Sequence, residues 1–211
     1  YNHFIKPSPD QMLRATVGLA LKRARLANVY SALRGKDAAT GVDNPDKREG
    51  QFTLMREAQA AVLNLANWHH FLDALKLAGY RGQKMVSSEA AIIFSYVLYL
   101  IGIRDYGIDR TRMRQAIAEF YFMASMTGRY TSSPETRFEA DLGQVRDLAS
   151  GEVFVAKLRE ICDTTLTNDY WEITLPSQLA TSAARSPTLF AYQASLIMLD
   201  APALFSPLKL A

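Results

Sequence analysis

A short stretch of the chain, residues 127–142, combines residue types that could bind an anion. It reads TGRYTSSPETRFEADL and places an arginine beside a tyrosine, Arg129 and Tyr130. A guanidinium group next to a free helix N-terminus forms a ready site for phosphate or carboxylate. The competing hypothesis is structural, because Arg129 could pair with Glu135 or Asp141 and lock two helices together. We favour the structural hypothesis, since buried polar groups are normally hydrogen-bonded within the fold.

Basic residues that could contact phosphates form two groups. They are Arg14, Lys22 and Arg25 in the first helical segment, and Arg110, Arg112 and Arg114 at the start of a later one. The first group falls within an arc of about 80° on a helix. The second occupies a helix N-terminus, where the dipole favours anions over cations. Such arginines pair with acidic residues of the fold, bind an external phosphate, or most commonly lie in solvent.

The histidines and the cysteine offer little catalytic chemistry. His69 and His70 are adjacent, which on a helix directs them about 100° apart and makes them poor ligands for one ion. His69 and Asp73 have the spacing of two ligands, but a catalytic zinc normally takes three from the protein and no third is evident. A nucleophile elbow and a Walker A loop are also lacking. We predict no catalytic residue and no metal site, and we expect Cys162 to be a small buried hydrophobe.

Helical periodicity runs along almost the whole chain, and strand-like alternation is nowhere sustained. With 49% hydrophobic and 21% charged residues, the composition is that of an ordinary globular chain. We therefore predict an all-α fold, an irregular bundle of about seven to eight helices in a single helical domain over residues 1–211.

Serine–proline pairs mark three helix starts, at Ser8, Ser133 and Ser186, because the hydroxyl can cap the helix and the proline suits its first turn. The expected helices cover about 9–34, 51–78, 87–103, 109–127, 134–148, 152–165 and 187–200. The polar segment 36–50 is expected to be a mobile loop. The charge-free runs 90–103 and 186–199 are expected to be buried core helices.

The stretch 127–142 is thus predicted to be an elbow between two helices. Gly128 suits the left-handed residue that ends one helix, and Ser132 or Ser133 caps the next. Glu135 then meets the positive end of the helix dipole. On the outer face of the second helix, Arg137 and Asp141 have the spacing of an ion pair.

Charge, cysteine content and hydropathy indicate the compartment. Basic residues exceed acidic ones by only three, 24 against 21, which permits a nucleic-acid partner without requiring one. The single cysteine excludes an internal disulfide and suits a reducing cytoplasm. The longest charge-free runs are shorter than the roughly 17 residues that a membrane span needs. We expect a cytoplasmic protein with no membrane partner.

The run FYFMASMTGRYTSSPETRFEADL resembles the helical middle region of GmrSD-like restriction proteins. In that family an aromatic-rich helix leads into a Gly-Arg-Tyr-Ser elbow and an acidic helix that closes on Asp-Leu; here Thr131 separates the tyrosine from the first serine. The resemblance covers about residues 50–206. The residues that match the family pattern are Arg129, Tyr130, Ser132, Glu135 and Asp141.

Proteins of this family open with a ParB-like domain carrying Asp-Gly-Gln-x-Arg and close with an HNH-type nuclease built on His-His-aliphatic-Phe-Pro. Neither motif is present here, and the His-His of WHHFLDAL lacks the proline. The resemblance implies a parent endonuclease of phage defence that cleaves modified or foreign DNA and uses a nucleoside triphosphate and a divalent metal. The chain begins at Tyr1 without a methionine, so we expect a fragment of that parent: a non-catalytic helical linker without a cofactor, whose partners are the flanking domains.

Two alternatives stay open, as does the oligomeric state. The chain could be a nucleic-acid-binding module that uses the two basic groups on DNA phosphates, in which case affinity falls steeply with salt. It could instead bind a small molecule in a pocket lined by Phe94, Tyr96, Phe120 and Tyr121. Aromatic residues at helical spacing are, however, far more often core.

Overall fold

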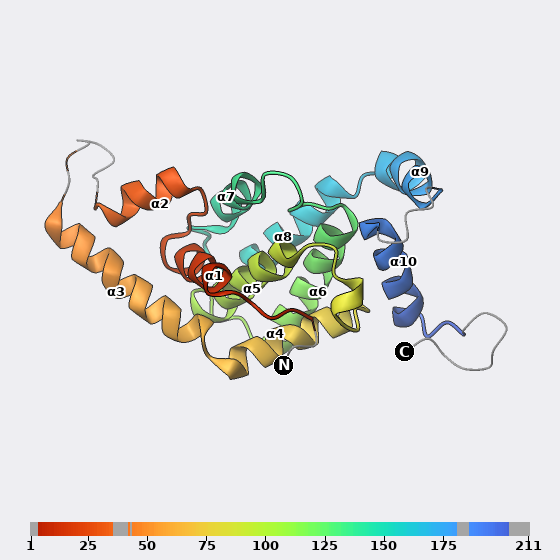
Figure 1. Ribbon diagram of the computed structural model, residues 1–211, viewed down its shortest axis with the longest axis horizontal. Helices are drawn as coiled ribbons and strands as arrows, with labels where there is room; N and C mark the ends of the chain where they lie inside the picture. The colour runs from red at the N-terminus through yellow and green to blue at the C-terminus, as the bar shows by residue number, and fades with distance from the viewer. Residues whose placement is uncertain (1–3, 36–41, 43, 181–185, 203–211) are drawn as a thin grey trace.

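The computed structural model describes residues 4–35, 42, 44–180 and 186–202 (Figure 1). In this part of the chain it has ten α-helices and no strand. The α-helices are α1 (Pro9–Leu21), α2 (Leu26–Leu33), α3 (Pro45–Val62), α4 (Leu65–Leu77), α5 (Glu89–Arg104), α6 (Arg110–Met126), α7 (Pro134–Val145), α8 (Gly151–Thr165), α9 (Leu175–Leu179) and α10 (Pro187–Met198). A 3-10 turn, η1 (Gln83–Met85), and a π-helical turn, η2 (Tyr170–Thr174), complete them. The all-α prediction is confirmed, whereas the predicted number of helices is too low.

The first predicted helix, 9–34, is broken into α1 and α2. The break lies at Lys22, whose φ of 52° is left-handed and ends α1. The Lys22 ammonium group donates to the carbonyl of Leu19 and pairs with Asp105 at 2.6 Å. A distant carboxylate therefore helps to hold a backbone conformation that lysine rarely adopts.

The second predicted helix, 51–78, is broken into α3 and α4 at Asn64. The Asn64 side chain accepts hydrogen bonds from the backbone N–H groups of Ala66 and Asn67, at 2.9 and 3.3 Å, and so caps a new helix. The apolar periodicity continues across this break, but Leu65 is 64% exposed.

The predicted loop 36–50 is wrong in its second part. Asn44 accepts from the N–H groups of Asp46 and Lys47, and α3 begins at Pro45. Residues 45–50 are therefore helical. Residues 36–41 and 43 lie outside the described part of the chain.

Helix α5 is the centre of the core. Every residue from Ala91 to Gly102 is buried, and α1, α4, α6 and α8 all contact it. The prediction of a buried helix at 90–103 is confirmed, because a charge-free run can be covered on all sides. The same prediction for 186–199 is wrong: α10 buries one face, while Tyr192 and Met198 are about half exposed.

Along the longest axis of the molecule, α2 and α3 lie at one end and α9 and α10 at the other (Figure 1). Between them lie α1, α5, α6, α7 and α8, in which α8 packs against α6 and α7. Among the described helices, none has both the length and the apolar character needed to traverse a bilayer.

Candidate functional site

The stretch 127–142 forms the connection between α6 and α7. Gly128 has a φ of 62°, the left-handed conformation predicted for the residue that ends a helix. Pro134 is the first residue of α7, also as predicted. The predicted serine cap is wrong: Ser133 occupies the cap position with a φ of 50°, and its hydroxyl caps no N–H group. Ser132 is exposed.

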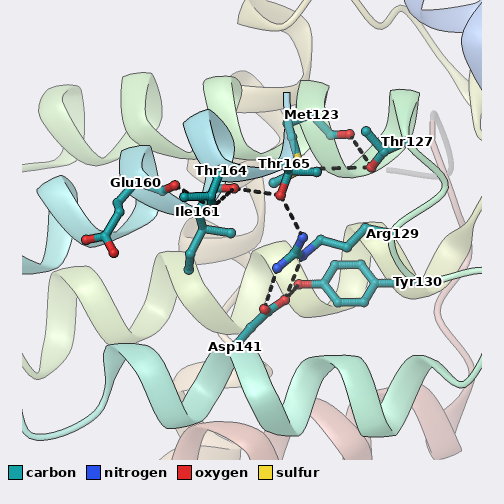
Figure 2. A network of polar contacts seen from close by, with 9 residues as sticks. All are labelled: Met123, Thr127, Arg129, Tyr130, Asp141, Glu160, Ile161, Thr164 and Thr165. Atoms are coloured by element: carbon teal, nitrogen blue, oxygen red, sulfur yellow. Dashed lines mark hydrogen bonds and ion pairs between the residues drawn. The ribbon is translucent and has the colours of Figure 1, made fainter. Parts of the chain in front are cut away.

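Arg129 and Asp141 form a buried bidentate ion pair (Figure 2). Arg129 donates from Nε to Oδ2 of Asp141 at 2.9 Å and from Nη2 to Oδ1 at 2.6 Å. The two side chains are 4% and 1% exposed. The Tyr130 hydroxyl donates to the same Oδ2 at 2.5 Å. Three donors thus converge on one carboxylate, and the Arg129 side chain is too buried to bind an anion from solvent.

The same guanidinium group also reaches α8. Its Nη1 donates to the Thr165 hydroxyl at 3.1 Å, and that hydroxyl donates to the carbonyl of Ile161 at 2.7 Å (Figure 2). Arg129 therefore joins the end of α6 to both α7 and α8. Asp141 faces the interior, so the predicted surface pair between Arg137 and Asp141 is wrong.

Neither donor beside Asp141 can exchange a proton near neutral pH. Burial works to lower the pKa of Arg129, but the hydrogen bonds and the charge of Asp141 outweigh it and raise that pKa above its ordinary value. Burial, together with the neighbouring Asp141 charge, raises the pKa of Tyr130 well above 10. The cluster has the chemistry of a structural lock and not of an acid–base pair.

Glu135, at the start of α7, is paired with Arg14 of α1, which also pairs with Asp10 at 2.8 Å. The elbow is therefore joined to α1 through the Glu135 carboxylate. This pair is half exposed and contributes little by itself.

Glu139 is a site residue that the sequence analysis missed. Helix α2 has no side-chain cap of its own, since Arg25 occupies the cap position. The Glu139 carboxylate accepts from the N–H groups of Ala24 and Arg25, at 2.5 and 3.0 Å, and from the side chains of Arg23 and Asn28, at 2.9 and 2.8 Å. No signal in the sequence indicated this contact, because residues 9–34 were predicted to form one unbroken helix.

The environment of Glu139 strongly favours its charged form. Burial alone would raise the pKa of Glu139, but the two backbone N–H groups and the two side-chain donors outweigh burial and lower it to about 2. The carboxylate is therefore a permanent cap for α2 at neutral pH.

The six candidate phosphate contacts fall into three kinds. Arg14, Lys22 and Arg112 pair within the fold, with Glu135, Asp105 and Glu152 respectively. Arg25 contributes its backbone N–H to Glu139. Arg110 and Arg114 form no ion pair with any described residue. Half of the predicted set is thus committed to internal contacts.

The possible metal ligands and the aromatic candidates lie in different parts of the fold. Asp73, which has the spacing of a second ligand beside His69, pairs with Lys76 at 3.2 Å. No three His, Cys, Asp or Glu side chains of the described residues gather as a metal site. Tyr96, Phe120 and Tyr121 are at most 1% exposed and belong to the core. Phe94 stacks on Phe138 with ring centroids 4.1 Å apart.

Comparison with known proteins adds no relative. No protein-family model matches the chain, and neither the curated proteins nor the solved structures contain a match.

Proposed function

We propose that this chain is a non-catalytic helical linker that couples the two flanking domains of a GmrSD-like restriction protein of phage defence. The observation that carries the proposal is the buried cluster of Arg129, Tyr130 and Asp141. These residues match the family pattern, and their side chains are fully used in holding α6, α7 and α8 together. A site whose charged groups are paired with one another inside the fold is better suited to holding helices in position than to catalysis.

Helix α7 is the element through which such coupling would pass. Each of its three acidic side chains binds a different part of the fold: Glu135 binds α1, Glu139 caps α2, and Asp141 holds Arg129 after α6. A displacement of α7 would therefore disturb three neighbours at once. Close-packed protein interiors transmit such strain.

The catalytic half of the proposal is tested on the purified chain. It is incubated with Mg²⁺ or Mn²⁺, with and without nucleoside triphosphate, on plain and base-modified duplex DNA. We expect no cleavage under any combination. Metal-dependent cleavage by the chain alone would refute a non-catalytic role.

The coupling half is tested in a protein that carries both flanking domains. Asp141→Asn should leave nucleotide hydrolysis active while nucleotide no longer stimulates DNA cleavage. Arg137→Ala, a change on the exposed face of the same helix, serves as the control and should leave stimulation intact. Normal stimulation in a folded Asp141→Asn variant would count against coupling through α7.

A further inference from the structure

A groove of about 570 Å³ lies where the end of α4 meets the start of α6. Its polar lining consists of Asp73, Lys76, Arg81, Thr111, Arg114 and Gln115. Three of these side chains are cationic and one is anionic, so the groove carries an excess of positive charge. Its volume is in the range of pockets that hold small ligands.

The cations of the groove keep donors free for a ligand. Arg81 uses Nη1 on the carbonyl of Lys76 at 2.8 Å, which anchors the guanidinium group and leaves its other N–H donors available. Lys76 makes one contact, with Asp73 at 3.2 Å. Arg114 has no hydrogen bond or ion pair to any described residue.

Arg114 lies near the positive end of the α6 dipole. It lies in the second turn of α6, beside Arg110 at the helix start, where the helix dipole is positive. The side chain of Asp109 already caps the N–H groups of Thr111 and Arg112, both at 3.0 Å. An anion here would therefore be held by side chains and not by the free N–H groups of the helix.

A buried hydroxyl group lies within the electrostatic influence of the same charged side chains. Tyr99 of α5 is 0% exposed, and its hydroxyl has no hydrogen-bond partner among the described residues. Burial chiefly raises the pKa of Tyr99, while the positive charges of Arg110 and Arg114 oppose that rise and Asp73 adds to it.

We propose that this groove binds the phosphate group of a small phosphorylated molecule. Arg81 and Arg114 supply planar guanidinium donors that fit phosphate oxygens in pairs, and Lys76 adds a point charge. Asp73, the one carboxylate in the lining, suits a hydroxyl group of the same ligand. The site is separate from the elbow and does not depend on the proposed coupling role.

The surroundings favour a single phosphate over a nucleic-acid backbone. Arg112, the basic residue between Arg110 and Arg114 in α6, is paired with Glu152 at 3.1 Å. Farther along the helix, Glu119 pairs with Arg159 at 3.0 Å, so that part of the surface carries no excess of positive charge. A DNA backbone needs an extended series of unpaired cations, and on α6 only Arg110 and Arg114 lack an ion pair to a described residue.

Isothermal titration calorimetry tests the proposal with four probes at fixed ionic strength: inorganic phosphate, glucose 6-phosphate, unphosphorylated glucose and a plain DNA duplex. We expect both phosphates to bind and glucose to give no signal. Arg114→Gln and Arg81→Gln should each weaken phosphate binding by at least about tenfold. Arg112→Gln is the matched control, since this arginine is paired elsewhere, and should change the affinity less than about twofold.

Three results would overturn the proposal. One is the absence of phosphate binding at millimolar concentration in a folded protein. Another is phosphate binding that Arg114→Gln and Arg81→Gln leave unchanged. The third is duplex binding that falls steeply with salt and that inorganic phosphate does not compete, which would assign these cations to nucleic acid.

Discussion

Arg129 and Asp141 face each other across the α6–α7 connection in a two-pronged ion pair, with N–O distances of 2.9 and 2.6 Å and almost no exposed surface. A buried pair of this kind stabilises only while both partners are present, because the loss of one leaves an uncompensated charge in the interior. The elbow is therefore sensitive to single substitutions.

Asp141→Asn tests this dependence. The change keeps the shape of the side chain and removes its charge, so Arg129 is left buried without a counter-ion. We expect the free energy of unfolding to fall by about 3–5 kcal/mol in urea titrations. Arg137→Ala on the exposed face of α7 should change it by less than about 0.5 kcal/mol. A loss below about 1 kcal/mol for Asp141→Asn would show that the pair contributes little.

Two tyrosine hydroxyls offer a matched comparison. Tyr130 donates to Asp141, whereas the equally buried Tyr99 hydroxyl has no partner among the described residues. Tyr130→Phe should therefore destabilise the fold by about 1–3 kcal/mol. Tyr99→Phe should be neutral or slightly stabilising in the absence of ligand. Equal losses for the two variants, measured by thermal unfolding, would contradict the hydrogen-bonding difference.

Gly79 is a position where the backbone of α10 allows no side chain. It has a φ of 83°, and a Cβ atom there would overlap the carbonyl of Ala194. Gly79→Ala should lower the free energy of unfolding by about 2–5 kcal/mol, because the left-handed backbone is strained for alanine and the Cβ atom clashes with Ala194. Gly107, with a φ of 61° and no neighbour within 4 Å of its Cβ position, is the control.

In the control, Gly107→Ala, only the left-handed strain remains, and we expect the free energy of unfolding to fall by about 1–2 kcal/mol. Urea unfolding of the two variants measures the difference. If both lose the same stability, the approach of α10 to Gly79 is looser than the structure shows.

The parts of the fold that local sequence predicts are those decided by local chemistry. The capping box of Ser8 with Gln11, the cap by Asp109 and the left-handed Gly128 all follow from residue types within one helical turn. The burial of α5 follows from its uninterrupted apolar run. These features need no knowledge of distant parts of the chain.

Most of the wrong sequence predictions depend on contacts between residues that are far apart in the chain. Nothing near Lys22 in the sequence indicates a left-handed break, because its partner Asp105 lies on another part of the chain. Likewise, the cap of α2 comes from Glu139, and the sequence alone could not link the two. Asn64 is different: its turn chemistry was visible, but the apolar periodicity on either side obscured it.

In the candidate site, too, contacts between residues close in the sequence were predicted and contacts between distant residues were not. The sequence restricted the partner of Arg129 to Glu135 or Asp141, and the structure gives Asp141. The involvement of Thr165 in α8 could not be predicted, since threonine in a helix carries no distinctive signal. Arg81 and Lys76 were missed because their proximity to Arg114 arises only when α4 packs on α6.

Glu139 should make stability depend on pH in acid. Its pKa of about 2 in the folded protein lies below the ordinary 4.5, so its contribution is complete above about pH 4.5 and is lost as the pH falls toward 2. At pH 7, Glu139→Gln should lose on the order of 2 kcal/mol, a value reduced for partial solvent screening. Urea unfolding at pH 7, 5 and 3 measures both proteins. The difference between them should shrink at pH 3; a constant difference would mean that the charge of Glu139 is not what caps α2.

Cys162 should be unreactive in the folded protein. Burial, assisted by the nearby charges of Glu119 and Asp163, raises the pKa of its thiol to about 12. At pH 8 only about one thiol in ten thousand is then ionised, and the thiolate is the species that reacts. We expect alkylation by iodoacetamide to be at least about a hundredfold slower in native buffer than in guanidinium chloride. Rapid native alkylation would show that α8 opens readily and that the thiol, and with it the Thr165 contact of Arg129, is less protected than the packing indicates.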